Sequence, residues 1–425
     1  MHLPPPDEIS APAQAGEAAC YRTHLKHRFP SFRWCLLSLP LTGLTNAGST
    51  DDFRIEQQVI TTSQGDYYWS QSRAAVIPGP VPRVILTTQE IERAGSHGYR
   101  DFYQLESTDR GHTWIGPTRI PSLQRARQPD GYDFVMGDAC PLYHARTGVV
   151  LATGKTFGFR DGRFEDLTRE RVSYAVFSPQ SSQWSGLRLL TLPAVDRTGH
   201  PMLEANAGCH QRYDAPDGTV LLPIRYRRDP KVRQYTTIVA RCTFDGETLR
   251  YVTHGSELTL SRDRGLYEPS ITRFGDRYFL SLRADHSSFV ARGADGLNFE
   301  PIAEWTFDDG SPLGSYNTQQ HWISRPDALY LVYTRRAGTN DHVFRHRAPL
   351  FIAQVDPETL QVRRKTEQVL VIEEGADLGA GFGVVDLAPN ETWVVTSEIQ
   401  PQSKAMPLSN RILLARIHWT SPRPD

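Results

Sequence analysis

Short apolar strands dominate the pattern of hydrophobic and polar positions along the chain. A turn is repeatedly followed by a run of about six apolar or β-branched residues that ends in a polar residue, and clear helical periodicity is absent. The pattern returns at intervals of about 50 to 70 residues. The six runs are Val84–Glu90, Val149–Lys155, Thr219–Arg225, Arg277–Arg283, Ala328–Thr334 and Thr392–Glu398. The sequence therefore predicts an all-β protein.

Six copies of one strand unit predict a six-bladed β-propeller in which each blade is a four-stranded antiparallel sheet. The run Phe53–Thr61 and the run Arg411–Trp419 could share one blade and close the ring, which removes exposed sheet edges. We expect this domain to span residues 53–420. The alternative is a pair of β-sandwiches with coincidental spacing.

The last residue of each run adds a candidate site to this fold. These residues are Glu90, Lys155, Arg225, Arg283, Thr334 and Glu398, and five of the six are charged. Equivalent positions in a ring of blades converge near its axis, where charges are costly unless they are paired or functional. The pattern therefore predicts a polar pocket at the mouth of the propeller.

Charge and composition limit the partners. The 425 residues include 47 basic and 48 acidic ones, so the formal net charge is -1. Such a balance gives no support for a nucleic-acid or acidic-membrane partner. The 32 glycines and 30 prolines are spread along the chain, as expected for many strands and turns.

The first 48 residues are typical of a leader. A basic stretch precedes the apolar run Trp34–Leu44, and small residues follow it. These are the parts of a secretory signal peptide, and the run is too short to span a bilayer. No later apolar run is long enough to span one, so we expect a secreted or periplasmic protein, the alternative being a disordered tail. Outside the leader, Cys140, Cys209 and Cys242 have no disulfide or metal spacing, and no motif demands a metal or cofactor.

One motif carries a family resemblance. Ser107–Trp114 reads Ser-Thr-Asp-Arg-Gly-His-Thr-Trp, in which the aspartate can accept backbone N–H groups and the glycine can take a positive φ. It closely resembles the Asp-box of the sialidase superfamily, where this hairpin is structural. Residues 293–299 look like a degenerate second copy. With the sixfold repeat, the motif strengthens the prediction of a sialidase-like propeller.

The resemblance also implies site residues. In that superfamily three arginines bind the sialic acid carboxylate, an aspartate acts as acid/base, and a glutamate activates a nucleophilic tyrosine. The corresponding positions resemble Arg73, Arg283 and Arg347 for the arginines, with Arg345 competing for the third place, Asp101 for the aspartate, Glu268 for the glutamate and Glu398 for the carboxylate that supports the first arginine. Guanidiniums suit this role because they bind carboxylates bidentately.

The chain departs from that pattern at the nucleophile. The expected tyrosine position holds Phe382, which has no hydroxyl. Tyr316 could supply one, or a water activated by Asp101 or Glu268 could attack directly. Polar segments that adjoin the apolar runs also suit a uronate lyase, which needs a cation for the carboxylate and a tyrosine or histidine for proton exchange. The candidates for that exchange are Tyr316, His210, His321 and His346.

Three functional hypotheses follow. The first is a secreted, exo-acting, sialidase-like glycoside hydrolase that acts on an acidic glycan or oligosaccharide containing sialic acid or uronic acid. The second is a polysaccharide lyase on uronate glycans, and the third is a non-catalytic glycan-binding propeller. The expected catalytic residues are Asp101, Glu268, Tyr316 and His321, and the expected substrate-binding residues are Arg73, Arg225, Arg283, Arg347, His346, His210 and Glu398. We expect a monomer without a metal or cofactor.

Overall fold

The computed structural model describes residues 52–63, 67–92, 97–128, 131–166, 170–399 and 410–421. The described residues all belong to one compact unit, Thr50–Asp425. The predicted leader, with its export signal, lies outside the described residues. No helix in the described part of the chain is long and apolar enough to cross a membrane.

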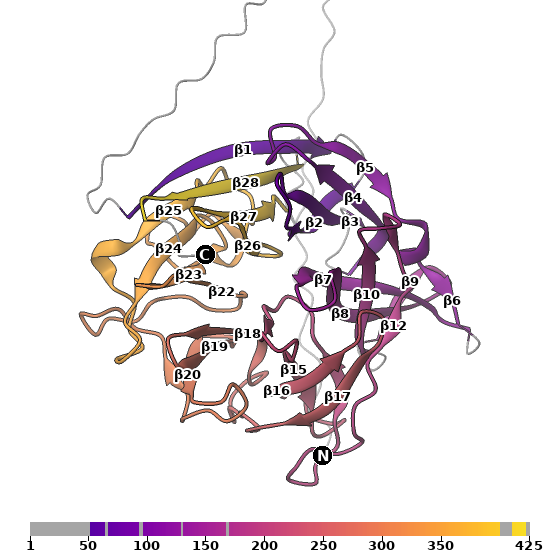
Figure 1. The fold of residues 1–425 in the computed structure, drawn as a ribbon. Coiled ribbons are helices and arrows are strands. Elements are labelled where there is room, and N and C mark those ends of the chain that lie inside the picture. The colour runs from indigo at the N-terminus through magenta and orange to yellow at the C-terminus, as the bar shows by residue number, and fades with distance from the viewer. Residues whose placement is uncertain are drawn as a thin grey trace, which may run out of the picture. The chain divides into compact units, whose positions relative to one another are not determined.

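The unit Thr50–Asp425 is a ring of six antiparallel sheets, as the sequence predicted (Figure 1). Blade 1 comprises β2 (Tyr67–Ile77), β3 (Arg83–Glu92), β4 (Tyr99–Ser107) and β5 (Ile115–Arg119). Blade 2 comprises β6 (Ala126–Arg127), β7 (Asp133–His144), β8 (Val149–Arg160), β9 (Arg163–Asp166), β10 (Val172–Ser178), β11 (Gln183–Trp184) and β12 (Arg188–Leu189). Blade 3 comprises β13 (Leu203–Asn206), β14 (Tyr213–Asp214), β15 (Val220–Arg227), β16 (Tyr235–Phe244) and β17 (Leu249–His254).

The remaining three blades each have four strands. Blade 4 comprises β18 (Tyr267–Phe274), β19 (Arg277–Arg283), β20 (Phe289–Gly293) and β21 (Ala303–Glu304). Blade 5 comprises β22 (His321–Ser324), β23 (Leu329–Tyr333), β24 (Leu350–Val355) and β25 (Gln368–Val371). Blade 6 comprises β26 (Gly383–Ala388), β27 (Glu391–Ser397), β28 (Asn410–Trp419) and β1 (Phe53–Ser63). Short 3₁₀ turns occur at η1 (Pro121–Leu123), η3 (Phe344–His346) and η4 (Arg364–Thr366).

The two ends of the domain close the ring. Strand β1 pairs antiparallel with β28, from Phe53 opposite Trp419 to Ser63 opposite Asn410. In Figure 1 the indigo strand β1 accordingly lies beside the yellow strand β28. This pairing confirms the closure expected from the sequence, and it covers the edge of a sheet that would otherwise remain open.

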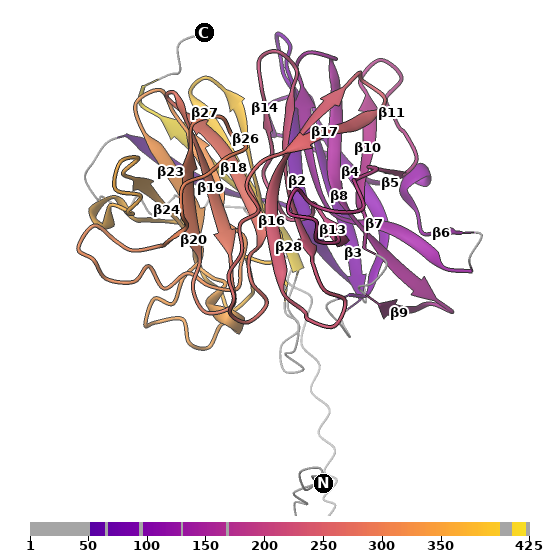
Figure 2. The ribbon, with the colours of Figure 1, turned by 90° about the horizontal axis from the view of Figure 1, so that it is seen from below.

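The six apolar runs form the second strand of each blade, namely β3, β8, β15, β19, β23 and β27. Each lies between an inner strand and a third strand, so both of its edges are paired, and the adjacent blades cover its faces; all eight residues of β15 are buried. Large side chains such as Trp322 and Trp393 fill the space between blades. Figure 2 shows the strands running between the two faces of the ring.

The inner strands share a feature that the sequence did not predict. In four blades the inner strand carries one extra residue relative to its partner, between Ser70 and Arg73, Gly137 and Cys140, Leu203 and Asn206, and Tyr267 and Ser270. The first residue of each bulge has a positive φ: Gln71 57°, Asp138 54°, Glu204 50° and Glu268 44°. Such backbone is unusual for residues other than glycine and is costly, so the surrounding structure must hold it in place. Bulges of this kind re-aim side chains locally.

The Asp-box forms the hairpin expected of it. The carboxylate of Asp109 accepts hydrogen bonds from the backbone N–H of Thr113 (2.9 Å) and from the Ser107 hydroxyl (2.8 Å), and Gly111 has a φ of 75°. In the degenerate copy, Asp295 accepts the N–H groups of Leu297 and Asn298. Asp245 and Asp356 make the same turn after the third strands of blades 3 and 5. The repeat is therefore more regular in structure than in sequence.

Candidate functional site

The bulged residues of three consecutive blades each carry a carboxylate that is paired with a cation on the next strand. Asp138 lies 3.0 Å from the Lys155 ammonium, Glu204 lies 2.7 Å from Nη1 of Arg227, and Glu268 pairs with Arg283. Each cation stands opposite the residue that precedes the bulge, namely Gly137, Leu203 or Tyr267. The charges at the mouth of the ring are therefore largely neutralised in pairs.

The register of the paired strands corrects which residues occupy equivalent positions in the blades, since the sequence prediction had counted these positions from the turns. Arg227, not Arg225, is the counterpart of Lys155 and Arg283, and in blade 1 the equivalent position opposite Ser70 is Gln89, not Glu90. Counting failed because the turns differ in length. Residues 78–82 join β2 to β3, whereas only residues 275–276 join β18 to β19.

Arg225 belongs to a buried network around Lys155. The Lys155 ammonium contacts Asp138 and, at 3.1 Å, Glu170, which also pairs with Arg225. Burial alone would raise the pKa of both carboxyls. At Asp138 the charges of Lys155 and Arg73 outweigh burial, and at Glu170 those of Arg225 and Lys155 do, so the pKa of each carboxyl is lowered. Arg225 is thus committed to partners within the protein.

Two of the predicted arginines meet at Asn317. Nη2 of Arg283 donates to the side-chain oxygen of Asn317 at 2.5 Å, and Nη2 of Arg347 donates to its backbone carbonyl at 2.6 Å. Arg264 donates to the same side-chain oxygen at 3.1 Å. Each guanidinium also has a carboxylate partner: Glu268 for Arg283, Asp377 for Arg347 and Asp285 for Arg264. The structure therefore brings Arg283, Arg347 and Glu268 together, as the sequence predicted.

Arg345 adds a positive charge that these carboxylates do not balance. Its side chain is exposed, and it makes no ion pair with any residue that the structure describes. Although much of the side chain is exposed, partial removal of the guanidinium from water lowers its pKa, and the nearby guanidiniums of Arg347, Arg283 and Arg264 lower it further. The buried Nε atoms of Arg283 and Arg347 also have no hydrogen-bond partner. We call Arg264, Arg283, Arg345 and Arg347 the Asn317 arginine cluster; three of its guanidiniums are paired with carboxylates, and Arg345 has no such partner among the described residues.

A tyrosine, a histidine and an aspartate form a hydrogen-bonded chain beside this cluster. The Tyr316 hydroxyl lies 2.5 Å from Nδ1 of His346, and Nε2 of His346 lies 2.9 Å from Oδ1 of Asp341. Tyr316 precedes Asn317 in the chain, and His346 lies between Arg345 and Arg347. The structure thus joins two predicted residues, Tyr316 and His346, next to the arginines.

Two other predicted residues have different surroundings. Asp101 lies on the third strand of blade 1 and pairs with Arg119 at 2.7 Å; it makes no hydrogen bond or ion pair with Glu268 or the Asn317 arginine cluster. Glu398 pairs with Arg411 at 2.5 Å, rather than with Arg73. Neither carboxylate is joined to the residues that the family resemblance assigned to it.

Arg73 is buried on the axis, with its donors used inside the protein. Nε donates to the carbonyl of Phe382 (2.9 Å) and Nη1 to that of Ala139 (3.0 Å), while Nη2 contacts Gln319 (3.1 Å) and Cys209 (3.4 Å). Four of the five N–H donors of Arg73 are thus used inside the protein, and the residue is only 3% exposed, so it is not available to a substrate carboxylate. Its geometry therefore supports a structural role rather than the predicted place in an arginine triad.

His210 and His321 are also buried inside the propeller. His321 contacts the Ser270 hydroxyl through Nδ1 and the Phe382 carbonyl through Nε2, both at 3.1 Å. Burial, together with the charge of Arg73, lowers its pKa to about 3. His210 contacts Thr153 at 3.1 Å, and burial lowers its pKa well below the ordinary value. Both imidazoles are therefore neutral groups of the interior and are not exposed to a substrate.

Phe382 is likewise closed to a substrate. Its side chain is fully buried, and its ring packs edge-on against His321 with a centroid separation of 4.8 Å. It belongs to the apolar core of blades 5 and 6. Any oxygen nucleophile of this protein must come from another position, and Tyr316 has a hydroxyl beside the arginines.

Comparison with known proteins identifies the fold. No family model and no curated protein matches the chain. Solved structures do match. One is a protein of unknown function from Dyadobacter fermentans, which matches with a TM-score of 0.63 at 15% identity over 87% of this chain and 100% of that one. Trypanosoma rangeli sialidase matches with a TM-score of 0.55 at 11% identity over 82% of this chain and 55% of that one. The NanB sialidase of Streptococcus pneumoniae matches with a TM-score of 0.55 at 10% identity over 87% and 71%.

The fold is that of the sialidase propellers. At these identities the likeness concerns the fold alone, and the chain spans about half the length of the Trypanosoma rangeli sialidase that it matches. The functional residues of this sialidase-like propeller must therefore be argued from its own geometry.

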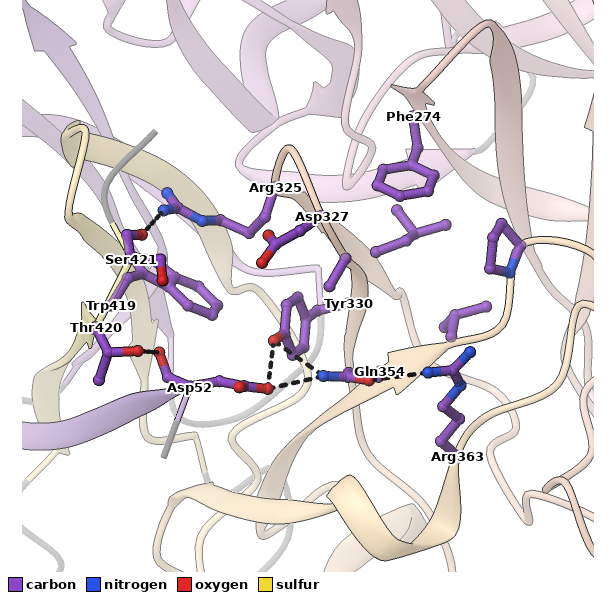
Figure 3. Close-up of a pocket in the computed structure, with 14 residues that line it drawn as sticks. Asp52, Phe274, Arg325, Asp327, Tyr330, Gln354, Arg363, Trp419, Thr420 and Ser421 are labelled. Carbon is purple, nitrogen blue, oxygen red and sulfur yellow. Dashed lines mark hydrogen bonds between the residues drawn. The ribbon is translucent and has the colours of Figure 1, made fainter. Parts of the chain in front are cut away.

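A cavity of about 320 Å³ lies elsewhere in the sialidase-like propeller (Figure 3). It is lined by Tyr330, Gln354 and Trp419 among others, and Asp52 accepts hydrogen bonds there from Tyr330 (3.2 Å) and Gln354 (2.8 Å). Phe274 also lines the cavity. Phe274 is the last residue of β18, whereas Glu268 lies at the beginning of the same strand. The cavity is thus separated from the Asn317 arginine cluster by roughly the length of a strand, ~20 Å. In the described residues, no group of three or more metal-ligating side chains is suitably placed to hold a metal ion.

Replacing Arg73 tests its structural role. Arg73→Lys leaves buried carbonyls without donors, so we expect the free energy of unfolding in denaturant to fall by about 3–5 kcal/mol. The exposed Arg54→Lys is the matched control and should change it little. Unchanged stability combined with a lost affinity for acidic sugars would instead place Arg73 in substrate binding.

The buried histidines predict a specific pH dependence of stability. In the unfolded chain His321 binds a proton below about 6.5, whereas in the fold its pKa is about 3. The unfolded state therefore binds more protons in this window, and stability is lost as the pH falls from about 6.5 towards 3, by up to about 1.4 kcal/mol per pH unit. His321→Gln should flatten this slope in unfolding measurements between about pH 4 and about pH 6, which lies inside that window. Replacement of the exposed His200 by Gln should leave the slope unchanged. Equal slopes in all three proteins would contradict this account.

Proposed function

We propose that this sialidase-like propeller is an enzyme that cleaves glycans at a carboxylated sugar bound by the Asn317 arginine cluster. The observation that carries the proposal is the excess positive charge of that cluster. Arg283 and Arg347 converge on Asn317 with buried, unpartnered Nε atoms, and the exposed Arg345 lies nearby without an ion pair among the described residues. Unpaired donors and positive charge together favour an anionic ligand.

A carboxylate suits this arrangement because of the shape of the guanidinium. Two planar guanidiniums can each offer parallel N–H groups to a carboxylate, and Asn317 holds both in place. Glu268 and Asp377 fix the far sides of Arg283 and Arg347, which leaves their orientation little freedom. The site is therefore preorganised for an acidic sugar rather than for a neutral one.

Hydrolysis is the first candidate reaction. The fold is shared with sialidases, one of which, the enzyme of Trypanosoma rangeli, has been solved in complex with sialic acid. A hydrolase needs an oxygen that attacks the anomeric carbon, and Tyr316 presents a hydroxyl next to the cluster, bonded to a base. We accordingly favour an exo-acting glycosidase on sialic or uronic acid sugars.

Elimination is the second candidate, and a specific observation favours it. The Tyr316–His346 pair stands beside the arginines, while Asp101, the predicted proton donor, does not. A lyase needs only a cation to neutralise the carboxylate and a group that takes and returns protons. The same residues could therefore break the glycosidic bond of a uronate without water.

The leader pattern in residues 1–48 supports export of the enzyme. We therefore propose a secreted or periplasmic location, where glycan polymers are accessible. Detection of the mature protein in the periplasm or the medium, with residues 1–48 removed, would support this. Full-length protein confined to the cytoplasm would contradict it.

Binding of acidic sugars tests the proposal. Arg283→Lys keeps the charge but loses the planar fork, so affinity for a carboxylated sugar should fall by about 1–3 kcal/mol, measured by calorimetry. Arg345→Gln removes the unpaired charge and should weaken binding with a smaller salt dependence. Arg54→Lys is the control, because Arg54 is exposed and lies far from the cluster along the chain. Unchanged affinity for every acidic sugar in both cluster variants would refute the site.

The products decide between the reactions. A panel of sialylated and uronate oligosaccharides is incubated with the enzyme and read by mass and ultraviolet absorbance. Hydrolysis adds one water to the products, whereas elimination adds none and creates a conjugated double bond that absorbs. Affinity without either product would leave only a glycan-binding propeller.

A further inference from the structure

We propose that Tyr316 is the reacting group of this site and that His346, oriented by Asp341, is the base that activates it. The inference rests on the proposed function for the identity of the substrate. It differs from the arrangement that the family resemblance implied, in which a glutamate activates a tyrosine close to the last blade. Here the base is an imidazole, and both groups belong to blade 5.

The hydrogen bonds fix the direction in which a proton moves. Nε2 of His346 lies 2.9 Å from the Asp341 carboxylate, which can only accept, so this nitrogen carries the hydrogen. Nδ1 is then left as an acceptor for the Tyr316 hydroxyl at 2.5 Å. A nucleophile bonded to a base that a third group orients is the general arrangement for activating a hydroxyl. Asp341 is exposed, so its part is to select the tautomer rather than to supply strong charge stabilisation.

The backbone around this chain is strained at three positions. Asn317, Arg345 and His346 have φ values of 51°, 55° and 53°, in the left-handed region that residues other than glycine rarely adopt. Two of these residues are consecutive, and the third adjoins Tyr316. Strain of this kind, at about 1–3 kcal/mol per residue, persists where the surrounding structure holds a functional geometry. It places Tyr316 and His346 against each other and against the arginines.

Accessibility singles out Tyr316 from the other hydroxyls nearby. Tyr267 and Tyr99 also bond to carboxylates, Asp285 and Asp138, but their side chains are buried. Tyr316 is only partly buried, as is His346. Of these three tyrosines, Tyr316 is therefore the one that a substrate held by Arg283 and Arg347 can reach.

The reaction then balances in two steps. In the first, the Tyr316 proton passes to Nδ1 of His346 while Oη bonds to the anomeric carbon; the bond to the leaving oxygen breaks with its electron pair, and that oxygen takes a proton from solvent. In the second, water adds to the anomeric carbon and releases a proton to solvent, the bond from Oη to carbon breaks, and His346 returns its proton to Tyr316. The net change is hydrolysis of one glycosidic bond.

Trapping the sugar on the enzyme tests this assignment. The probes are a sialyl fluoride and a glucuronyl fluoride, each with a second fluorine on the carbon next to the anomeric centre, which slows the second step. We expect a mass increase on the peptide that contains Tyr316, and none in Tyr316→Phe. Tyr103→Phe in blade 1 is the matched control, because its hydroxyl contacts Glu90 away from the cluster; it should be labelled at the wild-type rate.

Two further variants separate catalysis from folding. His346→Ala should slow labelling by about 10²–10⁴-fold, and added imidazole should restore part of the rate, which a merely structural role would not allow. Asp341→Asn should have a smaller effect of the same kind. Thermal unfolding of each variant checks that the fold is retained.

The possible results distinguish this inference from the proposed function. Labelling at another residue, or wild-type turnover in Tyr316→Phe, overturns the role of Tyr316 while the acid-sugar site stands. A double-bonded product without any label shows that the tyrosine does not act as a nucleophile and also overturns the inference. If the wild-type protein neither binds nor cleaves acidic sugars, the proposed function and this inference fail together.

Discussion

The rest of the propeller depends on the buried guanidinium of Arg73. Arg73 belongs to the inner strand of blade 1, and its hydrogen bonds reach Ala139 in blade 2, Cys209 in blade 3, Gln319 in blade 5 and the Phe382 carbonyl in blade 6. One planar group with five donors thus ties five blades to the axis. The Phe382 carbonyl completes this centre by accepting from Gln319 (3.2 Å) and His321 (3.1 Å) as well. A guanidinium that is buried and used in this way is not available to bind a substrate.

Above this centre, the inner-strand bulges determine which charges remain available. Each bulge in blades 2, 3 and 4 presents a carboxylate to a cation on the neighbouring strand, so Lys155, Arg227 and Arg283 are all paired. Buried pairs of this type add little net stability, but breaking one is costly, so the arrangement is rigid. The excess charge then appears where a guanidinium lacks a carboxylate, at Arg345. The guanidinium without a carboxylate partner therefore belongs to blade 5, beside the paired arginines of blades 4 and 5.

The sequence revealed the fold because the fold repeats. Six apolar runs, each needing cover on both faces, sufficed to predict six blades, and the alternating run Phe53–Thr61 revealed the closure with β28. The site was less accessible to sequence reasoning. Arg283, Arg345 and Arg347 were named, and Tyr316 and His346 were named as separate candidates, but Arg264 was missed. A bulge leaves no mark in hydrophobic periodicity, so Arg227 was missed as well. Arg73 was misjudged because the sequence shows a guanidinium but not the carbonyls that surround it.

The site lies where the repeat is broken. Blade 4 has an inner strand of eight residues, β18, whereas the inner strand of blade 5, β22, has only four, as has β13 of blade 3. The residues before β22 that would have extended it instead form the segment with Tyr316 and Asn317, and the connection from β23 to β24 carries Asp341 and His346. Because β22 does not extend to Tyr316, the segment before it and the connection from β23 to β24 lie outside the strand pairing of blade 5. These two loops bring Tyr316 and His346 together beside the Asn317 arginine cluster, while the other blades and Arg73 hold the frame.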